Sequence, residues 1–224
     1  MEKLSWDNVG ERQYETGTSK GVLFVQDAVG AYGVGVAWSG LVSVKQSPDG
    51  AEETPIYADN IKYLSMFSAE NFKGTIDAYT YPEEFAECDG SAEIVAASGV
   101  YAGQQERKSF GMAYSTVIGN DTLGNTYGEK IHLIYNATVS PSERSYETIN
   151  ETPSAITFSW GFTTVPVNVD DVPAIKRPTA YITINSTKVS APKFKAIKEL
   201  LYGNGTLASK LPTIAELVAL ITAV

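Results

Sequence analysis

The chemically reactive side chains are scarce in this 224-residue chain, which contains a single histidine and a single cysteine. His132 lies in an apolar stretch, and no Gly-x-Ser-x-Gly motif accompanies it to present a nucleophile. We therefore interpret His132 as a strand residue without a catalytic role. Cys88 stands between Glu87 and Asp89, whose charges disfavour the thiolate that nucleophilic attack requires.

Paired carboxylates are the other pattern that could support catalysis. Glu83 and Glu87 are four residues apart on a short helix predicted over Pro82–Cys88, and two such acids can hydrolyse glycosides when their pKa values differ. Acids are also preferred at the start of a helix, and we interpret Glu83 and Glu84 in that way. A glycosidase using Glu83 or Glu87 is the least favoured alternative.

Metal and nucleotide motifs are missing from the sequence. One cysteine and one histidine exclude multi-cysteine and two-histidine zinc motifs, and no acidic run has the spacing of an EF-hand loop. The glycine-rich segment 30–35 precedes a predicted strand rather than a helix, so it does not fit a dinucleotide fingerprint. We predict no catalytic residue, no metal site and no cofactor, and therefore a protein that is not an enzyme.

Charge is distributed unevenly along the chain, whose formal net charge is −9. From Lys193 onward, four lysines against two glutamates give +2, so the first 192 residues carry −11. The segments Gly74–Glu106 and Ser47–Asp59 contain several acidic residues and neither lysine nor arginine. Such a chain is a poor candidate for gripping nucleic acid, because phosphate binding needs clustered Lys and Arg.

Strand patterns dominate the first 190 residues and must position whatever function the chain has. Large apolar and small residues alternate over Ile156–Thr163 and over Phe110–Ser115, which is the period of a half-buried strand. Further strands are predicted at Gly21–Gln26, Gly33–Val44, Ile61–Met66, Lys73–Tyr79, Ile131–Tyr135 and Ala180–Asn185. The sequence predicts a mainly β protein, an antiparallel β-sandwich or barrel.

Helices are predicted at two places besides Pro82–Cys88. Pro192–Gly203 has proline near its start and glycine just past its end, and a second helix begins near Pro212. We expect one domain, with a β body over residues 1–192 and a helical C-terminal arm over 193–224. Residues 47–60 are expected to form a long exposed loop. The apolar segment Ile214–Val224 is too short to span a bilayer, so no membrane partner is expected.

An ordered series of segments resembles the major tail tube proteins of long non-contractile-tailed bacteriophages. The segments are Tyr57–Leu64, Tyr79–Gly90, Gly103–Gln105, Phe110–Gly111, Gly119–Thr122 and Pro153–Pro166. Together they cover the chain from about Trp6 to about Leu220. The resemblance implies a virion protein, assembled in the host cytoplasm, that forms hexameric rings through sheets joined across subunits. Related folds form the tubes of contractile tails and of type VI secretion.

The same resemblance implies partners. Rings of this family stack head to tail into the tail tube, through which DNA passes into the host without specific binding. Tape measure, terminator and baseplate-side proteins are the other expected partners. By analogy, Ser47–Asn60 is the candidate stacking loop, and its deletion is expected to block stacking. Met1–Lys20 and Lys193–Val224 are candidates for contacts with neighbouring subunits.

One alternative from a different class stays open at this point. The chain contains thirteen tyrosines, and a tyrosine-rich β-sandwich could bind carbohydrate as a receptor-binding module. Tyrosine is also a common anchor at protein–protein contacts. Loss of glycan binding on mutation of an exposed tyrosine cluster would favour the carbohydrate hypothesis.

Overall fold

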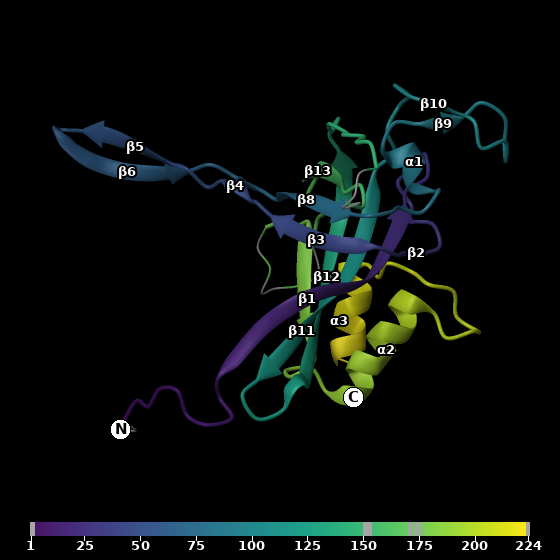
Figure 1. Ribbon diagram of the computed structural model, residues 1–224. Helices are drawn as coiled ribbons and strands as arrows, with labels where there is room; N and C mark the ends of the chain where they lie inside the picture. Colours follow the sequence, from purple (N-terminus) through teal and green to yellow (C-terminus); the bar gives the residue numbers. More distant parts are fainter. Residues whose placement is uncertain (1–2, 150–153, 170–171, 173–174, 176, 223–224) are drawn as a thin grey trace.

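The computed structural model describes residues 3–149, 154–169, 172, 175 and 177–222 (Figure 1). The protein is mainly β, with a large antiparallel sheet and a few helices, as the alternating segments predict. Its longer strands are β1 (Gln13–Val25), β2 (Val36–Trp38), β3 (Leu41–Gln46), β5 (Glu53–Ala58), β6 (Ile61–Phe67), β8 (Lys73–Ala78), β11 (Phe110–Asn120), β12 (Gly124–Val139), β13 (Phe158–Thr164) and β14 (Tyr181–Asn185). The two-residue strands are β4 (Asp49–Gly50), β7 (Glu70–Asn71), β9 (Ala92–Glu93) and β10 (Tyr101–Ala102).

Eight strands form the main sheet. Their order is β2-β1-β11-β12-β13-β8-β3, and β14 pairs with β12 beside this path. All the pairings are antiparallel. Three smaller two-stranded pairs, β4–β7, β5–β6 and β9–β10, lie outside this sheet.

One face of the central strands forms the first core. Met112 of β11 and Ile134 of β12 both lie on this face, because they are directly paired and the side chains of such a pair point to the same side of the sheet. They pack in one cluster with Ile76 of β8 and Trp160 of β13, so the two ends of the sheet fold toward each other. Helix α1 (Phe85–Cys88) adds Phe85, whose ring centre is 5.1 Å from that of Trp160.

The opposite face of β11 and β12 is covered by α2 (Ala191–Tyr202) and α3 (Ile214–Thr222). Proline at the second position of α2 suits a helix start, and Gly203, with φ of +76°, ends it. The apolar stripe of Phe194, Ile197 and Leu201 packs against the sheet. The predicted C-terminal arm therefore packs on the chain's own sheet (Figure 1).

Several predicted boundaries differ from the structure. The segment Gly33–Val44 is not one strand, because Gly40, with φ of +75°, turns the chain between β2 and β3. Helix α1 begins at Phe85 rather than Pro82, since the residues before it form turns. At the N-terminus β1 already begins at Gln13, so the part of the predicted arm outside the sheet ends at Arg12.

The segment Ser47–Asp59, expected to be a loop, contains β4 and β5 instead. Strand β5 pairs with β6, and β4 pairs with β7 at the base of the same hairpin. Figure 1 shows this hairpin projecting far from the sheet. The prediction of exposure was correct, whereas the prediction of a loop was wrong for β4 and β5.

Candidate functional site

The single histidine lies at the centre of a polar network on the first-core face of the sheet. His132 is only 5% exposed, and its ring stacks on Tyr114 with 4.6 Å between ring centres. Its Nδ1 lies 2.5 Å from the hydroxyl of Tyr181, and its Nε2 lies 2.9 Å from Oγ1 of Thr116. Thr116 in turn donates to Glu15, with 2.6 Å between the oxygens.

These contacts fix the direction of each hydrogen bond. Thr116 uses its proton for Glu15, so it accepts the proton on Nε2 of His132, and Nδ1 accepts from Tyr181. In a catalytic triad the acid orients the imidazole nitrogen that does not face the nucleophile. Here Glu15, 3.4 Å away, and the hydroxyl of Thr116 both lie at Nε2, so the acid and the threonine that could act as nucleophile share one nitrogen and do not form the triad arrangement.

Burial sets the protonation of this network. It lowers the pKa of His132, and the Glu15 carboxylate opposes that effect only in part. Partial burial would raise the pKa of Glu15, but hydrogen bonds from Lys130 and Thr116 outweigh it and hold that pKa below its usual value. The sequence pattern identified His132 as a strand residue but did not identify the partners Glu15, Thr116 and Tyr181, which come from three other strands.

The other reactive candidates lie apart from this network. Burial raises the pKa of the Cys88 thiol to about 12, and the nearby Glu87 carboxylate adds to the effect. Glu83 precedes α1 and is exposed, while Glu87 forms an ion pair of 2.7 Å with Lys108. Within the described part of the chain, no group of three His, Cys, Asp or Glu side chains is arranged to hold a metal ion.

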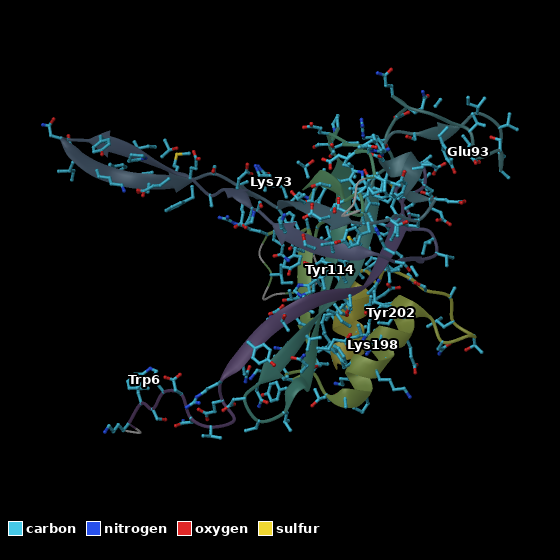
Figure 2. The ribbon with its side chains drawn as sticks, in the orientation of Figure 1. Trp6, Lys73, Glu93, Tyr114, Lys198 and Tyr202 are labelled. Atoms are coloured by element: carbon cyan, nitrogen blue, oxygen red, sulfur yellow. The ribbon has the colours of Figure 1, made fainter. Side chains whose placement is uncertain are left out.

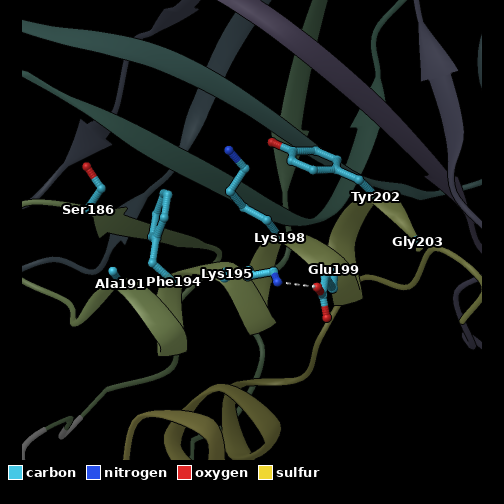
Figure 3. A pocket seen from close by; sticks show the side chains of 8 residues that line it. All are labelled: Ser186, Ala191, Phe194, Lys195, Lys198, Glu199, Tyr202 and Gly203. Atoms are coloured by element: carbon cyan, nitrogen blue, oxygen red, sulfur yellow. Dashed lines mark ion pairs between the residues drawn. The ribbon is translucent and has the colours of Figure 1, made fainter. Parts of the chain in front are cut away.

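A pocket of about 410 Å³ lies along α2 (Figure 3). Two polar side chains in the wall of this pocket extend toward the sheet, and both already have partners within the protein. Lys198 Nζ lies 2.8 Å from Glu129 Oε2, and the Tyr202 hydroxyl lies 3.0 Å from Ser115 Oγ. Partial burial would raise the pKa of Glu129, but hydrogen bonds from Lys198 and Lys20 lower it overall. These charges serve to fasten the helix to the sheet.

The projecting hairpin β5–β6 presents a different kind of surface. The register pairs Thr54 with Met66 and Ile56 with Leu64, so these four side chains share one face. Lys62 and Ser65 both contact Glu53, which places these three on the other face. We call it the polar face; Phe67, which pairs with Glu53, also lies on it and is exposed. Ile61 pairs with Ala58 and falls on the side of Ile56.

The apolar face of this hairpin has no cover within the described chain. Ile56, Ile61, Leu64 and Met66 are 39%, 65%, 41% and 57% exposed. The exposed tyrosines of the hairpin do not form a joint platform, since Tyr57 pairs with Lys62 on the polar face and Tyr63 is the extra residue at a bulge. An isolated two-stranded hairpin is only marginally stable in water. This surface is therefore a candidate contact surface.

Two strand edges of the main sheet also lack partners among the described residues. β2 pairs with β1 only from Gly21 to Leu23, so residues 13–20 pair with β11 alone. On the far side of the central strands, β14 pairs only with β12. The β1 edge and the β14 edge thus bound the same four strands, β1, β11, β12 and β14, on opposite sides. Unpaired edges are templates for pairing with another chain.

The two acidic segments do not gather into one surface. The acidic residues of Ser47–Asp59 lie on the hairpin, whereas Glu83, Glu84 and Glu93 lie around α1 and the β9–β10 pair. Figure 1 shows these two regions at opposite ends of the molecule. The acids of the two segments therefore occupy two separate places.

No model of a protein family matches this chain, and no curated sequence matches it either. The helices in the described part of the chain all lack the length and apolar character needed to cross a bilayer. Of the segments that carry the resemblance, Pro153–Pro166 begins outside the described residues.

Proposed function

We propose that this chain is a self-assembling structural protein, a subunit of hexameric rings that stack into the tail tube of a long non-contractile-tailed bacteriophage. The observation that carries the proposal is the projecting β5–β6 hairpin with its uncovered apolar face. The sequence resemblance is the reason for proposing a tail tube rather than another kind of assembly.

The hairpin supports a contact between copies of the chain. Covering the exposed half of Ile56, Leu64 or Met66 contributes about 1 kcal/mol per side chain. Repetition of that contact around a ring multiplies the gain. We assign the hairpin to the contact between stacked rings, where its apolar face packs on the next ring.

The open sheet edges support the ring itself. Pairing the β1 edge of one copy with the β14 edge of the next is a head-to-tail contact, which closes into a ring when the rotation between copies divides a full turn. Closure removes exposed edges that otherwise favour aggregation. DNA then passes through the lumen without specific binding, since a net charge of −9 does not favour contact with phosphates.

The location and partners follow from this assignment. The protein belongs to the virion tail and assembles in the host cytoplasm. Its remaining partners are the tape measure, terminator and baseplate-side tail proteins. The buried apolar residues of Lys193–Val224 pack on the chain's own sheet, and only Leu207 and Ile221 are large apolar residues left exposed among those described in it. We therefore assign the ring and stacking contacts to the strand edges and the hairpin rather than to this segment.

Light scattering of the purified protein across a concentration series tests the proposal. The wild type should form large assemblies, and L64K should raise the concentration needed for assembly by at least about tenfold, because a lysine on the apolar face opposes its burial. The matched control is L207K, since Leu207 is 46% exposed against 41% for Leu64 and lies in the loop after α2. Wild-type protein that stays monomeric throughout, or equal effects of L64K and L207K, contradicts the proposal.

A further inference from the structure

A groove of about 460 Å³ lies between the start of β2, α1 and the β9–β10 pair. Its apolar lining comes from Val34, Val36, Ala86, Ala97 and Tyr101. Val34 is 65% exposed and Tyr101 is 44% exposed, so apolar surface faces solvent here. We name this feature the α1 groove.

The rim of the α1 groove is acidic. Glu83 and Glu84 line it, are exposed, and form no ion pair within the described part of the chain. Glu93 also lines the groove, and its carboxylate is used internally, accepting from the backbone N–H groups of Ala97 and Gly99. These bonds hold the β9–β10 turn in shape. An apolar floor with acidic residues at its edge suits an apolar segment that carries a cation.

Within the N-terminal segment 3–12, residues 3–6 have that chemistry, while Asp7 follows them directly. Leu4 and Trp6 are 74% and 76% exposed, and Lys3 precedes them. The base of the segment is fastened to the β11–β12 turn, because the N–H of Gly10 lies 3.0 and 3.1 Å from the two carboxylate oxygens of Asp121. Segment 3–7 is thus presented from a fixed point, with its large apolar side chains in solvent.

The segment cannot be assigned to the groove of its own copy. Figure 2 shows Trp6 and Glu93 at opposite ends of the molecule. We infer that the α1 groove receives Lys3–Trp6 of a second copy, with Leu4 and Trp6 on the apolar floor and Lys3 facing Glu83 and Glu84. This inference rests on the proposed self-assembly and specifies one of its contacts. A tryptophan in such a pocket is a strong anchor for a protein–protein contact.

Cysteine cross-linking in assembled protein tests this contact. Each copy of the S5C/V34C variant carries both cysteines and keeps the Trp6 anchor, so mild oxidation should give a ladder of covalent oligomers on a non-reducing gel. The matched control is S5C/V165C, because Val165 is 65% exposed like Val34 but lies outside the α1 groove. A mixture of the single variants S5C and V34C should give cross-linked dimers of the two variants without the ladder.

Charge reversal provides a second measurement. K3E and the double variant E83K/E84K should each lower the cross-linking yield by about two- to fivefold, the range expected of exposed ion pairs, and their combination should restore it. Electron microscopy of the same samples shows whether the protein has assembled, so that a failure of the groove contact can be distinguished from a failure of assembly. Assembled S5C/V34C protein without cross-links, or with yields equal to those of S5C/V165C, overturns the groove contact and leaves self-assembly standing.

The competing occupant has its own outcome. If Y63C/V34C cross-links efficiently and S5C/V34C does not, the hairpin rather than the N-terminal segment occupies the groove, and the inference is wrong. If the wild-type protein forms no assembly, both the groove contact and the proposed function fail.

Discussion

The β11–β12 pair and the β5–β6 hairpin are both antiparallel strand pairs, yet they differ in what covers them. Strand β11 is buried on both faces, by the folded sheet on one side and by α2 and α3 on the other. The β5–β6 hairpin has exposed apolar side chains and projects from the body. The first pair is stabilised by its own chain. The second is not covered by any part of the chain that the structure describes, and that difference is the basis of the proposed assembly.

The largest expected difference between the two strand pairs is the stability lost when one leucine of each is replaced by alanine. Leu133 on β12 is fully buried, so L133A should lower the free energy of unfolding by about 2–5 kcal/mol. L64A on the hairpin should change it by less than about 1 kcal/mol in monomeric protein. Urea unfolding at low protein concentration measures both. A larger loss in L64A than in L133A would contradict the account.

A smaller effect is the pH dependence that the covered pair should carry. The folded pKa of His132 lies below its unfolded value, mainly through burial, so the unfolded state takes up this proton first as the pH falls. Stability should therefore decrease as the pH falls below about 6.5, with a slope of at most about 1.4 kcal/mol per pH unit.

The lowered pKa values of Glu15 and Glu129 affect stability only at lower pH, below about 4.5, so the two contributions are separable. Urea unfolding between pH 7 and pH 5 measures the slope for the wild type and for H132Q. The variant should lose most of this slope even if its stability at pH 7 is reduced. An unchanged slope in H132Q would assign the effect to other groups.

The smallest effect is expected on the polar face of the hairpin. Lys62 forms an ion pair with Glu53, and both side chains are partly exposed. K62A should change stability by about 0.5 kcal/mol or less, because exposed ion pairs contribute little. It should also leave assembly intact, unlike L64K on the apolar face. Light scattering of K62A compares the two faces directly, and loss of assembly would show that the polar face is part of the contact.

Local patterns predicted most of the elements but not how they are combined. The alternation in Phe110–Ser115 and Ile131–Tyr135 indicated β11 and β12, and Pro192 with Gly203 marked α2. Strand β5 was missed because Pro55 and the surrounding polar residues obscure the alternation, although its partner β6 was predicted.

The polar network around His132 was beyond sequence reasoning for a different reason. Glu15 and Thr116 are 101 residues apart, and only the strand register brings them together. The same holds for the uncovered face of the hairpin, because exposure depends on where the rest of the chain packs. The resemblance indicated which segments are candidates for contacts. The strand register in the structure showed which residues of the hairpin share its apolar face.

Negative-stain electron microscopy of the purified protein tests the central claim most directly. Wild-type protein should form six-fold rings and stacked tubes, while L64K should give separate rings or subunits under the same conditions. L207K should resemble the wild type. A wild-type protein that remains a dispersed monomer at high concentration, or L64K tubes indistinguishable from those of the wild type, would contradict assembly through the β5–β6 hairpin.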